Sequence, residues 1–162
     1  MSDAGERCVG CGALVPQSDG PTHEYIGASP GCWAIFGEVS AAAPLHQLMV
    51  DTYAAQHPGT PSRRSIQSVA VHLISLYLQL ERGVQPARAR EAIIAALAIA
   101  YRFVWLDPPS WADALTILDV RGAQDASEHE TRVRAWAASV WRAWSPHHGA
   151  VRAWAELAGV RG

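Results

Sequence analysis

Lysine is absent from this chain of 162 residues, and charged residues of any kind make up only 17% of it. All 13 basic residues are therefore arginine, and the net charge is close to −2. A protein that binds the phosphate backbone of nucleic acids needs a basic face, so we expect no nucleic-acid partner. With 49% apolar residues, the chain is also too hydrophobic to be wholly disordered.

Long hydrophobic runs are also missing. The longest mainly apolar stretch, residues 92–106, is interrupted by Arg102 and is too short to cross a bilayer, so we expect no membrane association. The N-terminal residues MSDAGERCVGCG contain no apolar stretch behind basic residues, so we expect no secretory signal and a cytoplasmic protein. The sequence contains no P-loop, no dinucleotide-binding fingerprint and no nucleophile elbow, which excludes the enzyme classes built on those motifs.

The length fits a single domain, residues 1–162, with an N-terminal loop segment (1–30) in front of a helical part (31–162). Glycine and proline in the first thirty residues predict loops and a short hairpin. The later pattern predicts helices over about 32–39, 45–56, 60–83, 86–104, 127–144 and 145–157, while 115–120 fits either a strand or a helical turn. We therefore predict an all-α fold, an antiparallel helical bundle with an N-terminal zinc-knuckle-like loop cap.

Several helix ends have recognisable signals in the sequence. Thr60 is the expected N-cap of the third helix and Gly83 its end. Ser127 and Glu130 have the spacing of a capping box at the start of the fifth helix. On that fifth helix, Trp136 and Trp144 lie on one face, a spacing that predicts packing in the core.

Three cysteines are the main chemical signal. Cys8 and Cys11 form a C-x2-C motif followed by glycine, a spacing that lets two thiolates of one turn bind the same metal ion. Cys32 lies at the start of the first expected helix, where the positive helix end favours a thiolate. A tetrahedral zinc site needs a fourth ligand, and His23 is the first choice, followed by His57 and then His46. We expect such a zinc to be structural, because four protein ligands leave no open position.

Other uses of these cysteines fit less well. Haem attachment requires histidine after the second cysteine, where this chain has Gly12. An iron–sulfur cluster usually takes a fourth cysteine. A thioredoxin-like pair belongs in a βαβ context, and a structural disulfide does not suit the cytosol. Three unrelated small buried residues are the remaining alternative.

The third helix has a polar stripe on an otherwise apolar surface. The stripe contains Ser65, Ser68, His72, Ser75 and Gln79. Because buried polar groups need partners, we expect this stripe to face other polar groups or an internal cavity. We hypothesise a catalytic or second metal site built from His46, Asp51, His57 and His72, with His129 as a further candidate. The alternative for each histidine is a hydrogen-bonded residue of the core or the surface.

Two arginines occupy the first turn of the same helix. Cations there oppose the helix dipole, which stability alone disfavours. Arg63 and Arg64 are therefore candidate ligands for a carboxylate or phosphate, together with the free amides of the helix end. The alternative is a pair of solvated arginines near acidic residues.

Several segments together resemble a known family. These segments are CVGCGALVP, GPTHEYIGASPGCWAIFGEV, HQLMVDTYAAQHPG, PSRRSIQSVAVHL, LERG and EHETRVRAWAASVWRAWSPHH. With them the chain resembles an uncharacterised bacterial, largely actinobacterial, domain-of-unknown-function family. The resemblance implies a complete single-domain member, and no activity comes with it.

Two functions from different classes are consistent with these features. The first is a small zinc-binding helical protein whose His/Asp-lined cavity performs metal- or histidine-assisted acid/base chemistry on a small polar or anionic molecule. The second is a non-catalytic module in which zinc orders a surface that docks a protein partner. The sequence leaves the oligomeric state open, a homodimer included.

Overall fold

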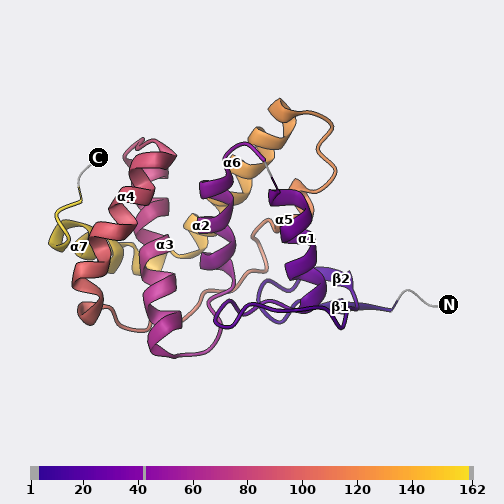
Figure 1. Ribbon diagram of the computed structural model, residues 1–162, viewed down its shortest axis with the longest axis horizontal. Coiled ribbons are helices and arrows are strands. Elements are labelled where there is room, and N and C mark those ends of the chain that lie inside the picture. The colour runs from indigo at the N-terminus through magenta and orange to yellow at the C-terminus, as the bar shows by residue number, and fades with distance from the viewer. Residues whose placement is uncertain (1–3, 42, 161–162) are drawn as a thin grey trace.

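The structure is a computed structural model that describes residues 4–41 and 43–160. Helices dominate it, as predicted, and a two-stranded hairpin lies at the N-terminal end (Figure 1). The elements are β1 (Gly5–Arg7), β2 (Leu14–Pro16), α1 (Pro30–Ser40), α2 (His46–Gln56), α3 (Arg63–Glu81), α4 (Pro86–Ala96), the 3-10 helix η1 (Leu97–Arg102), α5 (Ile117–Val120), α6 (Ala126–Ala143), the 3-10 helix η2 (Ser145–His147) and α7 (His148–Leu157).

The predicted helices are all present, but several ends differ. The third helix begins after Ser62 rather than Thr60, because the Ser62 side chain accepts the Ser65 N–H. The fifth begins after Asp125, whose carboxylate caps the Glu128 N–H in place of the predicted box from Ser127. The expected helix over 86–104 is α only to Ala96, continues as a 3-10 turn, and is extended from Phe103. The ambiguous segment at 115–120 forms a single helical turn, α5.

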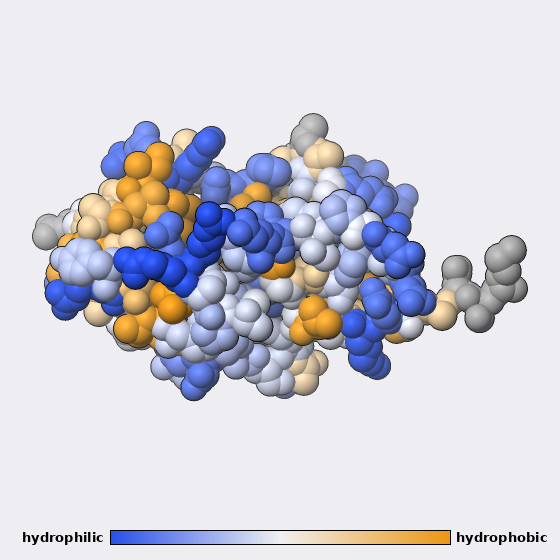
Figure 2. Space-filling view, turned by 60° about the horizontal axis from the view of Figure 1, so that its bottom comes forward, coloured by the Kyte–Doolittle hydropathy of each residue, from blue (hydrophilic) through white to orange (hydrophobic). Residues whose placement is uncertain are grey.

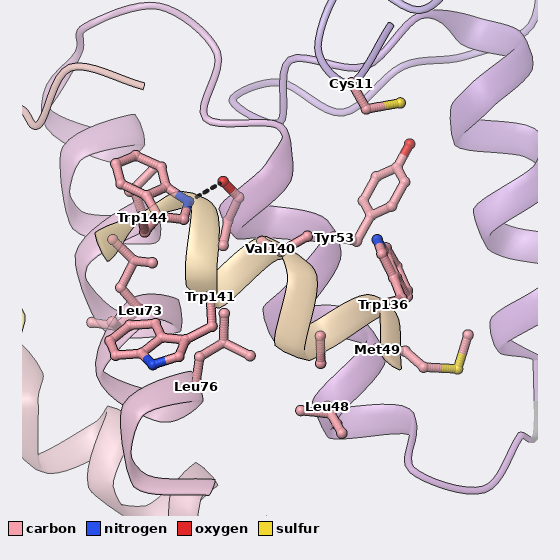
Figure 3. Close-up of a cluster of buried hydrophobic side chains, with 14 of the residues drawn as sticks. Cys11, Leu48, Met49, Tyr53, Leu73, Leu76, Trp136, Val140, Trp141 and Trp144 are labelled. Atoms are coloured by element: carbon pink, nitrogen blue, oxygen red, sulfur yellow. Dashed lines mark hydrogen bonds between the residues drawn. The ribbon is translucent and has the colours of Figure 1, made fainter. Parts of the chain in front are cut away.

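The core lies where α2, α3 and α6 meet (Figure 3). Helices α2 and α3 lie side by side and are joined by the short connection 57–62 (Figure 1). Trp136 of α6 and Trp144, the residue that follows its end, are completely buried, which confirms the packing predicted from their spacing. Their indole N–H groups donate to Gln56 Oε1 at 2.9 Å and to the Ala55 carbonyl at 3.0 Å. Helix α6 is thereby fixed against the C-terminal end of α2.

The N-terminal hairpin packs directly on the start of α1. Its two strands are antiparallel, with Glu6 opposite Val15. Val15 is 1% exposed and belongs to the same core. Gly31 allows the close approach, because a Cβ added there would lie 2.0 Å from the Pro16 carbonyl oxygen. The hairpin turn is therefore held near the beginning of α1, where Cys32 lies.

The surface is mostly hydrophilic in Figure 2, with apolar atoms gathered at the end of the molecule that carries α4 and α7. Exposed Ile94, Leu97 and Val104 come from α4, η1 and the segment after them. Among the helices of residues 4–41 and 43–160, none has both the length and the apolar character needed to cross a membrane.

Candidate metal centre

Three separate segments bring the three cysteines and His57 to one place. Cys8 and Cys11 lie in the turn between β1 and β2, which is closed by backbone hydrogen bonds from Cys8 N–H to Ala13 O (2.8 Å) and from Gly12 N–H to Cys8 O (3.0 Å). Cys32 projects from the first turn of α1. His57 follows directly after α2. The side chains of all four candidate ligands are buried.

The ligand atoms of these four residues have the spacing of a tetrahedral metal site. The three sulfurs and one ring nitrogen all lie within 4.8 Å of one another. Cys11 Sγ is 4.0 Å from Cys32 Sγ, and Cys32 Sγ is 3.6 Å from His57 Nε2. A zinc tetrahedron with Zn–S of about 2.3 Å and Zn–N of about 2.0 Å has edges of about 3.8 Å between sulfurs and about 3.5 Å between sulfur and nitrogen. We call these four residues the Cys3His centre.

The surroundings of His57 prepare its ring to be a ligand. Its Nδ1 lies 2.8 Å from the Tyr53 carbonyl oxygen. Since a carbonyl can only accept, Nδ1 carries the proton, and the lone pair of the neutral ring is on Nε2, the atom that faces Cys32. The Tyr53 ring stacks on His57 with centroids 4.0 Å apart, and the Tyr53 hydroxyl donates to Cys32 Sγ at 3.2 Å. Tyr53 thus orients one ligand and stabilises negative charge on another.

Three thiols packed so closely cannot all ionise easily without a cation. Hydrogen bonds from Cys11 and Cys32 lower the pKa of Cys8. The hydrogen bond with Cys11, together with that to Cys8 and burial, raises the pKa of Cys32. The bond with Cys32 lowers the pKa of Cys11, but the bond with Cys8 and burial outweigh it and raise this pKa to about 11. A divalent cation removes the conflict, because coordinated thiols lose their protons.

The structure places His57, the second choice from the sequence, in the fourth ligand position instead of His23. His23 is partly buried in the loop before α1, and its Nδ1 accepts the Tyr25 N–H at 3.3 Å. Its ring also packs edge-on against Trp33. The position of His23 between the cysteines in the sequence favoured that residue, but the path of the chain brings the end of α2, and with it His57, back to the hairpin turn.

Gly10 is required for the close contact between the hairpin turn and the His57 ring. A Cβ at this position would lie 2.4 Å from the Gly27 carbonyl oxygen and 2.4 Å from His57 Cδ2. We therefore expect Gly10→Ala to displace the ring and lower metal affinity by about tenfold or more, as measured by competition with a chromophoric chelator. Gly37→Ala is the matched control, because a Cβ there meets nothing within 4 Å and the position is helical. Equal affinities of the two variants would contradict this prediction.

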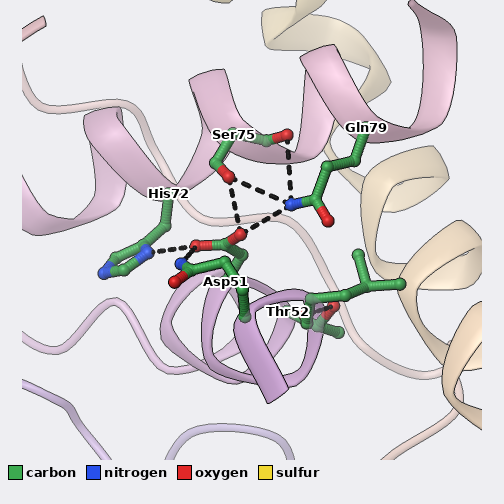
Figure 4. A network of polar contacts seen from close by, with 7 residues as sticks. Asp51, Thr52, His72, Ser75 and Gln79 are labelled. Atoms are coloured by element: carbon green, nitrogen blue, oxygen red, sulfur yellow. Dashed lines mark hydrogen bonds and ion pairs between the residues drawn. The ribbon is translucent and has the colours of Figure 1, made fainter. Parts of the chain in front are cut away.

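A second polar cluster forms between α2 and α3 (Figure 4). Asp51 is completely buried, and its carboxylate accepts four hydrogen bonds. The donors are His72 Nδ1 (2.7 Å), Gln47 Nε2 (2.9 Å), Ser75 Oγ (2.6 Å) and Gln79 Nε2 (2.8 Å). Three of these donors belong to the polar stripe predicted on the third helix, and they turn toward a polar partner as expected. We call Asp51 and its four donors the Asp51 cluster.

The four residues proposed as one catalytic cavity do not meet. Asp51 and His72 are in contact, whereas His57 belongs to the Cys3His centre and His46 Nδ1 lies 3.0 Å from the Ser40 carbonyl. The physical reason is the helical rotation of α2. Asp51 lies on the face of α2 that packs on α3, whereas His46, at the start of α2, and His57, beyond its end, contact other parts of the chain. His129, the further candidate, is on α6, and its buried Nε2 has no hydrogen-bond partner among the described residues.

Arg63 and Arg64 are both exposed in the first turn of α3, beside a hollow of about 530 Å³. Arg64 Nη1 pairs with Glu24 Oε2 at 2.7 Å, with exposed fractions of 65% and 73% for the two side chains. An ion pair so exposed contributes little to stability. The arginine is therefore available to another anion.

Two residues, one at the Cys3His centre and one in the Asp51 cluster, are not among the candidates predicted from the sequence. The sequence patterns give no role to Tyr53 or to Gln47. The signal for Gln47 was its position one turn before Asp51, where an amide reaches a carboxylate along the helix. Nothing local marks the contact of Tyr53 with Cys32, since the two residues are 21 positions apart.

Comparisons with known proteins give a family but no activity. No curated protein and no solved structure matches this chain. The model of a family of unknown function, DUF5946, matches residues 6–145, which include all of the Cys3His centre and the Asp51 cluster. Since this match spans most of the 162 residues, the chain belongs to the DUF5946 family of unknown function.

Proposed function

We propose that the protein binds one zinc ion at the Cys3His centre and that this ion fastens the N-terminal segment to α1 and α2. The observation that carries the proposal is the agreement of two ligand separations, 4.0 Å and 3.6 Å, with the edges of a zinc tetrahedron. A set of three thiolates and one imidazole binds zinc in preference to magnesium and calcium, which are harder cations and take oxygen ligands.

A structural role for the ion fits the surroundings better than a catalytic one. All four ligands come from the protein, and all four are buried, so no coordination position is open to a substrate. The ion joins three parts of the chain that are distant in sequence, namely the hairpin turn, the start of α1 and the end of α2. A reducing compartment such as the cytoplasm suits the assignment, because zinc binds thiolates and not disulfides.

The centre also supports the loop in front of α1. The Gly27 N–H donates to the carbonyl of the ligand His57 at 3.0 Å, and Val9 N–H donates to Ser29 Oγ at 2.9 Å. The stretch that includes Tyr25 is therefore hydrogen-bonded to the residues around the ion.

Elemental analysis of untagged protein, purified without added chelator, tests the proposal. We expect one zinc per chain, loss of the metal in Cys32→Ser and in His57→Ala, and full retention in the matched control His23→Ala. Circular dichroism checks that each variant keeps its helices, and a cobalt-substituted sample reports tetrahedral thiolate coordination directly. A zinc content unaffected by His57→Ala, or no bound metal in the wild-type protein, would refute the assignment.

A further inference from the structure

His72 binds Asp51 through one ring nitrogen and leaves the other nitrogen at the surface. Nδ1 is bound to buried Asp51, so the neutral ring carries its proton there and its lone pair on Nε2. Figure 4 shows the other ring nitrogen pointing away from the carboxylate. In the part of the chain that the structure describes, Nε2 has no hydrogen-bond partner, and the side chain is 18% exposed. A proton acceptor is thus held in one orientation at the surface.

This nitrogen belongs to a pocket along α3. The pocket has a volume of about 360 Å³, at the small end of the range for ligand sites, and is lined by Tyr25, Arg64, Gln67, Ser68, Val71 and His72. A larger hollow at the start of the same helix shares Tyr25 and Arg64 with it. The two hollows meet at the arginine. A ligand near His72 is therefore within reach of a cation.

We propose that His72, positioned by Asp51, and Arg64 form a binding site for a small molecule that carries a phosphate group, with His72 Nε2 accepting a proton from the ligand. This inference is independent of the zinc assignment, since neither residue is a metal ligand. The phosphate supplies both the negative charge for the guanidinium and the O–H for the imidazole.

The Asp51 cluster gives the site its chemistry. When Nε2 takes the proton, an N–H bond forms as the ligand O–H bond breaks, and the electron pair stays on the ligand oxygen. The ring becomes cationic, and the Asp51 carboxylate 2.7 Å away stabilises it. Three donors besides His72 hold this carboxylate still, so little reorganisation is needed during the transfer. Asp51 is a positioning residue and does not touch the ligand.

Glu24 is the residue that opposes anion binding. Its carboxylate pairs with Arg64 at 2.7 Å, so a bound phosphate must replace it on the guanidinium. Because the pair is largely exposed, the replacement costs little. The two members of this ion pair should therefore have opposite effects. Removing the charge of Glu24 strengthens phosphate binding, and removing Arg64 weakens it.

Titration of the 15N-labelled, zinc-loaded protein with inorganic phosphate, followed by NMR of the histidine rings, tests the site. We expect His72, assigned by comparison with His72→Gln, to show the Nδ1–H tautomer before phosphate is added and saturable shifts as it is added. Arg64→Ala should weaken the apparent affinity by about fivefold or more, and Glu24→Gln should strengthen it about twofold or more. Arg90→Ala, which removes an exposed arginine of α4, is the matched control and should change nothing.

Several outcomes would overturn the proposal. One is the absence of saturable His72 shifts, including the case in which phosphate perturbs only residues at the start of α3. Another is an equal effect of Arg64→Ala and Arg90→Ala, which would indicate general charge attraction. The zinc content of each variant is measured in parallel, so that failure of the metal centre is distinguished from failure of the His72 site.

Discussion

Removing the metal from the Cys3His centre is expected to unfold the N-terminal segment while most of the helical core survives. Residues 4–29 contain two strands of three residues each and few large buried side chains, so they have little core of their own. Zinc binding to such sites supplies on the order of 10 kcal/mol, which is more than a hairpin of this size contributes. The core helices α3 and α6 do not depend on the ion in the same way, because they pack on each other and on α2.

Hydrogen exchange with mass spectrometry measures this effect. Treatment with a strong chelator should remove protection from residues 4–29 and from the start of α1, and added zinc should restore it. The middle of α3 and of α6 should keep most of its protection and serves as the internal reference. Unchanged exchange in the N-terminal segment of demonstrably metal-free protein would show that the hairpin is held by packing alone.

Replacing Asp51 by asparagine is expected to destabilise the protein by about 3–5 kcal/mol, since it breaks a buried, charge-assisted network. The carboxylate accepts from four donors, whereas an amide has a single acceptor oxygen and brings two N–H groups of its own. At least one buried N–H, from His72, Gln47 or Gln79, would then face another donor. The substitution keeps the size of the side chain, so the loss reports hydrogen bonding rather than a cavity.

Chemical unfolding in urea gives the free energy for this comparison. Gln47→Ala is the matched control, because it removes one of the four donors and leaves the carboxylate with three, at an expected cost of about 1 kcal/mol. The zinc content of both variants should equal that of the wild type. A loss below about 1 kcal/mol for Asp51→Asn would show that the Asp51 cluster contributes little to stability.

The sequence was informative wherever the signal was local. The C-x2-C-G turn, the polar stripe on α3 and the tryptophan spacing on α6 each depend on residues within a few turns of one another, and each has the predicted form. Helix ends were less predictable, because Thr60, Ser62, Ser127 and Asp125 are all good capping residues. The choice between them depends on where the preceding chain runs.

Periodicity and motif spacing specify which residue types share a turn or a helix face. The order of the amino acids therefore indicates a helical protein, a thiol turn near its N-terminal end and a buried polar face on α3. The packing of distant segments places His57 and not His23 beside the thiols, pairs Asp51 with His72, and leaves His46 outside both clusters. The reason is geometric. The rotation of α2 about its axis and the return of the chain at 57–62 select which side chains meet across a long sequence separation, and no local pattern encodes either quantity.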